Sequence, residues 1–146
     1  MDLGASSPFS PGCTDPDLVT LFKGWVYLST APHGDFSGSR LQGFFAAGTC
    51  FVDLYRIAIN GQVPRCTFGA PLSAEQWSGV FIVPGSAREG DLPAGTIPVG
   101  ALDLTVLRAV DDGWIETLSV VNHSEREREV EVVLEWNCPL SDPQAL

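Results

Sequence analysis

Apolar and polar residues alternate over short stretches of the chain, which is the pattern of β-strands and not of helices. Glycines and prolines separate these stretches, and no long segment has the 3.6-residue periodicity of an amphipathic helix. In the clearest predicted strand, alternate residues place one set of side chains on the same face: Leu102, Leu104, Val106, Arg108 and Val110. In the next predicted strand, the corresponding face carries Trp114, Glu116, Leu118, Val120 and Asn122. The alternation therefore predicts an all-β chain with little or no helix.

The segment Asp111-Asp112-Gly113 lies between these two strands and predicts a hairpin. A three-residue loop with its glycine in the left-handed conformation would set Arg108 opposite Glu116. A two-residue turn would instead set Arg108 opposite Thr117. We favour the three-residue loop, because it pairs apolar residues with each other and a guanidinium with a carboxylate. Arg108 and Glu116 are thus expected to form a structural ion pair.

A third strand follows the polar segment that begins at His123. Its predicted apolar face consists of Val130, Val132, Leu134 and Trp136. This strand would complete a three-stranded antiparallel meander with one buried side, so Trp114 and Trp136 are expected in the core.

The earlier part of the chain would supply the second layer. Residues 49–59 predict one continuous strand, Asn60-Gly61 a tight turn, and residues 63–68 a return strand. Pro64 cannot donate to a ladder, which favours an edge position for that return strand. Further strands are expected at residues 25–30 and 79–83, with a surface connection at 84–100. Together the strands predict a single antiparallel β-sandwich, supersandwich-like in type.

Length and charge narrow the classes of function. The 146 residues suffice for one domain, which we divide into a loose leader (1–18), the sandwich (19–138) and a tail (139–146). The formal net charge of -10 argues against nucleic acid or an anionic membrane as partner. The N-terminal residues lack the basic and apolar regions of an export signal, which predicts a cytoplasmic location with reduced thiols. The even number of four cysteines is also compatible with two disulfide bridges.

Candidate catalytic chemistry is sparse. Glycoside hydrolysis needs two carboxyl groups, and the acids within or beside apolar patterns are Asp35, Asp53 and Glu116. Each has a simpler structural interpretation, so we predict no catalytic residues. The two histidines, His33 and His123, fall in expected loops without ligands at metal-binding spacing, and the sequence indicates neither a metal nor a cofactor.

Ligand binding has three candidate residues. Trp77 lies among polar residues and is the tryptophan expected to be exposed, where its ring could stack on a sugar. A tryptophan that covers a sheet edge at an interface is the alternative interpretation. His33 and Asp35 flank Gly34 and could form a small polar pocket, although a simple turn is the alternative interpretation.

Two stretches are similar to a known family. Gly43-Phe44-Phe45 through Asn60-Gly61, and Ile97-Pro98 through Leu134-Glu135, resemble in order and spacing the N-terminal domain of bacterial glycogen-debranching, amylo-α-1,6-glucosidase-like proteins. Residues 25–35 resemble the family's opening strand and Gly-Asp loop. The chain departs from the family at Gly48-Thr49-Cys50, where the family has Asp-Thr-Arg.

The resemblance implies a role without catalysis. Family members typically continue into an α/α-barrel that carries the glycosidase acid and base, and the present sequence has no such segment. The resemblance thus implies a β-sandwich module that is not itself an enzyme. Such a module would pack against an α/α-barrel partner or contact an α-glucan. The alternative is a stand-alone structural protein that self-associates, with a homodimer as its simplest form.

Overall fold

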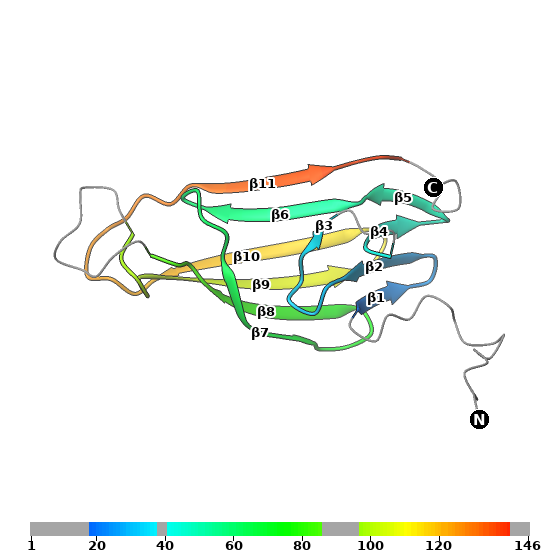
Figure 1. Cartoon of the computed structure of the whole chain (residues 1–146). Helices are drawn as coiled ribbons and strands as arrows, with labels where there is room; N and C mark the ends of the chain where they lie inside the picture. Colours follow the sequence, from blue (N-terminus) through cyan, green and yellow to red (C-terminus); the bar gives the residue numbers. More distant parts are fainter. Residues whose placement is uncertain (1–17, 38–40, 86–96, 141–146) are drawn as a thin grey trace, which may run out of the picture.

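The computed structural model describes residues 18–37, 41–85 and 97–140, and this part of the chain forms strands and no helix. The strands are β1 (Val19–Lys23), β2 (Val26–Thr30), β3 (Phe36–Ser37), β4 (Gly43–Ala46), β5 (Thr49–Val52), β6 (Leu54–Ile59), β7 (Arg65–Pro71), β8 (Gln76–Ile82), β9 (Leu102–Val110), β10 (Trp114–Asn122) and β11 (Val132–Asn137). Figure 1 shows their arrangement. The all-β prediction is confirmed.

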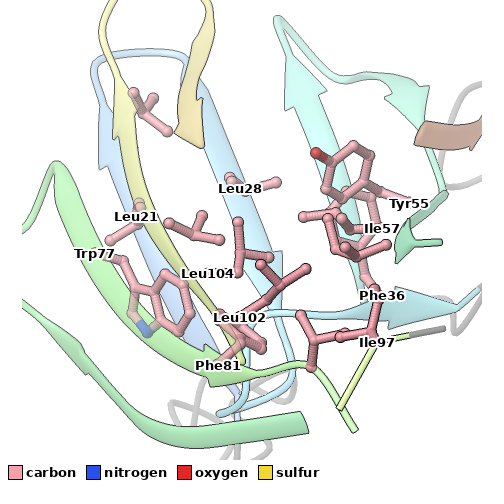
Figure 2. Close-up of a cluster of buried hydrophobic side chains, with 14 of the residues drawn as sticks. Leu21, Leu28, Phe36, Tyr55, Ile57, Trp77, Phe81, Ile97, Leu102 and Leu104 are labelled. Carbon is pink, nitrogen blue, oxygen red and sulfur yellow. The ribbon is translucent and has the colours of Figure 1, made fainter. Parts of the chain in front are cut away.

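The strands form three antiparallel sheets, with the orders β10-β9-β8-β7, β1-β2-β4-β5 and β11-β6-β3. One hydrophobic core joins all three sheets, as in a sandwich. Leu21 and Leu28 enter it from β1 and β2, Ile57 from β6, and Trp77 and Leu104 from β8 and β9 (Figure 2). The β7–β10 sheet is one layer, and the two other sheets cover its inner face.

The β9–β10 hairpin has the register that the side-chain pattern favoured. Trp114 lies opposite Val110, and Glu116 lies opposite Arg108, so a three-residue loop connects the strands. The glycine prediction is wrong, because Gly113 has no positive φ. The Asp111 N–H donates to the Gly113 carbonyl oxygen at 2.9 Å, and this bond closes the loop without a left-handed residue.

The Asn60-Gly61 turn is present, with φ values of 47° and 75°. Ile59 and Gln62 exchange backbone hydrogen bonds across it, at 2.8 and 3.0 Å. The ladder stops there, because the strand after Pro64 pairs with β8 and not with β6. β7 does occupy a sheet edge, as expected from the proline.

Two long-range expectations are wrong. The continuous strand at 49–59 is interrupted at Asp53, so β5 and β6 belong to different sheets. The Asp53 N–H donates to the Asn137 carbonyl oxygen at 3.2 Å, and the Asn137 amide donates to the Asp53 carboxylate at 2.8 Å. These bonds hold the residue out of both ladders, where the chain passes from one sheet to the next.

The second error concerns β11, which pairs with β6 and not with β10. Asn60 directs this choice: its N–H donates to the Glu131 carbonyl at 2.9 Å, and its side-chain oxygen accepts from the Glu131 N–H at 2.6 Å. The C-terminal meander is therefore two-stranded. Trp136 is 61% exposed and outside the core, whereas Trp114 is partly buried and packs on it.

Three smaller expectations need adjustment. Trp25 lies in the β1–β2 turn before its strand begins, and the short strand predicted at 79–83 starts earlier, at Gln76. The 84–100 connection is not wholly on the surface, since Ile97 belongs to the core. The leader up to residue 17, residues 86–96 and the end of the tail from residue 141 lie outside the described residues.

Candidate functional site

The candidate site lies at one row of the inner face of the β7–β10 sheet. Glu116, Arg108 and Trp77 follow one another across β10, β9 and β8. Even-numbered positions of β9 point to the core, which is why Arg108 is buried there, between Val106 and Val110 on the same strand face. Among the described residues it is the one buried charged side chain, 3% exposed. A charge in such a place requires a partner, because desolvation otherwise costs several kcal/mol.

Glu116 supplies that partner and receives four hydrogen bonds. Arg108 donates from Nε to Oε2 at 3.0 Å and from Nη2 to Oε1 at 3.1 Å. Trp114 Nε1 donates to Oε2 at 3.0 Å, and the Tyr55 hydroxyl donates to Oε1 at 3.1 Å. A carboxylate offers about four lone-pair positions. All of them are occupied, so Glu116 has no acceptor position left for a substrate. The predicted Arg108–Glu116 pair is present, as a bidentate bridge.

Aromatic rings surround the guanidinium. Its carbon lies 5.2 Å from the ring centroid of Trp77, 5.6 Å from that of Trp114 and 5.9 Å from that of Tyr55. These distances fall within the range of cation–π attraction. The remaining donor, Nη1, reaches the Gly34 carbonyl oxygen at 2.7 Å. The arrangement fixes Arg108 on every side and ties β9 to the loop before β3.

Burial and the Glu116 charge also act on the hydroxyl of Tyr55. They raise the pKa of Tyr55 above its usual value of 10.0, with burial as the larger cause. The hydroxyl therefore stays protonated at alkaline pH values where an ordinary tyrosine ionises, and it remains a donor to Glu116 there. The whole cluster is suited to holding the sheets in place.

The expectation that Trp77 is exposed is wrong, since the residue is 1% exposed. Three glycines, one in the loop before β3, one on β7 and one on β8, make room for its ring. A Cβ would lie 2.7 Å from a ring atom at Gly34, 2.7 Å at Gly69 and 2.2 Å at Gly79. The polar neighbours of Trp77 in sequence belong to the strand's outer face and its turn, which made the segment look exposed. In this position Trp77 cannot stack on a sugar.

His33 and Asp35 lie at the surface above the cluster. Their side chains are about half exposed, with His33 Nε2 3.8 Å from Asp35 Oδ2. Partial burial raises the pKa of Asp35 from its usual value of 3.8, while the charges of His33 and Arg108 oppose the change. The two residues are close together as the sequence suggested, and Gly34 between them has φ 91° and faces the Trp77 ring.

The other polar candidates have separate partners. The Asn137 side-chain amide, at the last residue of β11, donates to the Asp53 carboxylate. His123 Nε2 lies 2.7 Å from Asp103 Oδ2, near the first residue of β9. Within residues 18–37, 41–85 and 97–140, no group of three His, Cys, Asp or Glu side chains could hold a metal ion. In the same ranges no helix is long and apolar enough to span a membrane.

Sequence reasoning identified Arg108 and Glu116 but missed Tyr55 and Trp114 as ligands of the carboxylate. The alternation had placed Trp114 and Glu116 on one strand face, which was a usable signal for that contact. No local signal points to Tyr55, which reaches the carboxylate across 61 residues of sequence.

The fold and this cluster define an all-β sandwich domain whose buried ion pair is structural. A family model described as the N-terminal domain of some glycogen debranching enzymes matches residues 21–144. The match covers most of the 146 residues, so the chain belongs to this family. No curated protein matches the chain.

Proposed function

We propose that the chain is a non-catalytic accessory module that packs against the α/α-barrel catalytic domain of a glycogen-debranching-type enzyme. Membership of an N-terminal domain family supports an accessory role. The buried cluster supports the absence of catalysis, because its one carboxylate already accepts from four protein donors.

The observation that carries the packing proposal is the outer face of the β7–β10 sheet. Odd-numbered positions of β9 and β10 point outward there, and four large apolar side chains of this face are exposed: Phe68, Leu107, Ile115 and Val121. The strands of this sheet align their residues in rows that run across it. Arg65 of β7 and Asp103 of β9 are the charged residues of this face, and both lie in the row at one end of the sheet. The four side chains lie in different rows of the sheet, with Thr105, Thr117 and Ser119 among them. Four large apolar side chains exposed on one sheet face support packing against a partner. We call it the outer face below.

Isothermal titration of the chain with a separately produced α/α-barrel domain of a glycogen-debranching enzyme tests this proposal. Leu107→Lys places a charge at the centre of the outer face and is expected to weaken binding at least about tenfold. Val63→Lys, at an exposed apolar residue outside the outer face, is the matched control and should bind as the unchanged chain does. Absence of binding, or equal binding by the Leu107 variant, would refute the role of the outer face.

Contact with an α-glucan is a second proposal, and the exposure of Trp25 favours it. This residue lies at the β1–β2 turn and is 85% exposed. The Ala47 N–H of the neighbouring β4–β5 turn donates to its carbonyl oxygen at 3.0 Å, which fixes the backbone below the ring. A maltooligosaccharide titration followed by tryptophan fluorescence should give a saturable change that Trp25→Ala abolishes. An unchanged spectrum at millimolar sugar would count against glucan contact.

A further inference from the structure

Strand β11 combines a free backbone edge with exposed apolar side chains. It is the outermost strand of the β11-β6-β3 sheet, and all six of its residues are exposed. In Figure 1 it runs along the upper margin of the molecule, and none of the other described strands lies beyond it. Four of the six side chains are large and apolar: Val132, Val133, Leu134 and Trp136. An uncovered strand edge of this kind is a template for pairing with another strand.

Three of these side chains form one continuous row. Val132, Leu134 and Trp136 lie opposite the buried residues of β6, so they point to the core side of their sheet. They are nevertheless exposed, Val132 by 41%, Leu134 by 40% and Trp136 by 61%. This row is called the β11 row below. A second β11 placed alongside would continue the sheet and give the row a partner.

The sequence of β11 is complementary to itself in one register. A two-fold axis perpendicular to the sheet pairs two antiparallel copies of a strand about a central residue. With the axis at Leu134, the leucines of the two copies face each other, and Val132 faces Trp136. Both are apolar pairs of the kind that stabilises sheets. On the opposite side of the sheet Val133 faces Glu135, whose neighbour on β6 is Arg56.

The positions of the glutamates and the end of the strand exclude the alternative registers. An axis at residue 135 sets Glu135 against its own copy, and an axis at residue 133 sets it against Glu131. An axis at residue 132 sets Glu135 against Glu129, and an axis at residue 136 carries half of the pairs past the end of β11. Like charges directly opposite destabilise a sheet. Charge pattern and apolar row therefore select the same centre.

We propose that two copies of this chain associate through β11, antiparallel and centred on Leu134, so that the β11-β6-β3 sheet continues across both molecules. The surface is distinct from the outer face, and the proposal does not depend on the accessory role. Stable interfaces bury roughly 1,200–2,000 Å². One short strand from each copy supplies less, so a weak, reversible dimer is expected. Each copy carries a net charge of -10, and added salt should tighten the association by screening the repulsion.

Sedimentation equilibrium over a range of concentrations up to about 1 mM tests the association. Leu134→Lys brings two ammonium groups together at the two-fold axis and should weaken the dimer at least about tenfold. Leu107→Lys is the matched control, since Leu107 is 41% exposed and Leu134 40%, but it lies on the outer face. The control should dimerise normally, and denaturation curves should show both variants folded. A strictly monomeric chain, or a Leu134 variant that dimerises unchanged, overturns the proposal.

Cysteine cross-linking tests the register. The exposed thiol of Cys138 could cross-link by itself, so it is replaced by serine, as is Cys13, which lies outside the described residues. Leu134→Cys then sets two thiols opposite each other, at a Cα separation of about 4.5–5.5 Å that suits a disulfide. Mild oxidation should give a covalent dimer. Val133→Cys faces Glu135 of the other copy and should cross-link far more slowly. Faster cross-linking at residue 133 overturns the register.

Binding of the Leu134→Lys chain to the α/α-barrel domain is expected to be unchanged, which separates the two proposals.

Discussion

Removal of the Glu116 carboxylate tests the structural interpretation of the buried cluster. Glu116→Ala leaves the Arg108 guanidinium 3% exposed and without a counterion, and deprives Tyr55 and Trp114 of their acceptor. Breaking a buried ion pair on one side costs about 3–5 kcal/mol. The lost hydrogen bonds belong to the same desolvated group, so they are included in this range and not added to it. A domain of this size has about 5–15 kcal/mol of stability in total, and the variant should be close to unfolding.

Urea denaturation followed by tryptophan fluorescence measures this loss. The double variant Arg108→Met with Glu116→Leu removes both charges and should recover part of the stability, because no unpaired charge stays buried. Recovery is partial, since Tyr55 and Trp114 still lack their acceptor. Asp111→Ala, which breaks the exposed pair with Lys23, is the control and should have a far smaller effect. A loss below about 1 kcal/mol for Glu116→Ala, or a double variant no more stable than the single one, would contradict the structural role of the ion pair.

Three further predictions concern packing and protonation. Gly79→Ala forces a Cβ to 2.2 Å from the Trp77 ring and should lower the free energy of unfolding by about 3 kcal/mol, measured by heat or urea. Gly61→Ala, at a residue with φ 75° and open space around it, should lower it by about 1 kcal/mol. Equal losses for the two variants would contradict the packing argument. Because the raised pKa of Asp35 makes the folded state hold more protons than the unfolded state, wild-type stability should fall as pH rises through and above 3.8. Asp35→Asn should therefore gain relative stability over this window in urea titrations, and a difference that does not change with pH would count against it. Spectrophotometric titration should show no tyrosinate from Tyr55 until the chain unfolds, and ionisation near pH 10.0 in the folded state would contradict its burial.

Local patterns were sufficient for the β9–β10 hairpin. The alternation of apolar positions and the meeting of Arg108 with Glu116 select one register, and the structure has it. The Asn60-Gly61 turn is similarly local, because two adjacent residues carry the positive φ angles that it requires. Both features depend on residues within a few positions of each other, so a single sequence contains all the information they need.

Contacts between remote segments decided the burial of Trp77. Its immediate neighbours are polar, and the space for its ring comes from glycines at positions 34, 69 and 79. These glycines have meaning only when the loop before β3, β7 and β8 come together. An exposed ring was therefore a reasonable expectation from the segment alone, and the folded chain reverses it.

The same distinction applies to β11. Its alternating apolar residues predicted a strand, but they fit β10 and β6 equally well as partners. Asn60, some seventy positions earlier, selects β6 through its bonds to the Glu131 backbone. The strands, the positions of the tight turns and the alignment of one hairpin were predictable from the amino-acid sequence, because they depend on neighbouring residues. The grouping of strands into sheets, the burial of each tryptophan and the open strand edge were not predictable, because they depend on segments that meet after the chain has folded.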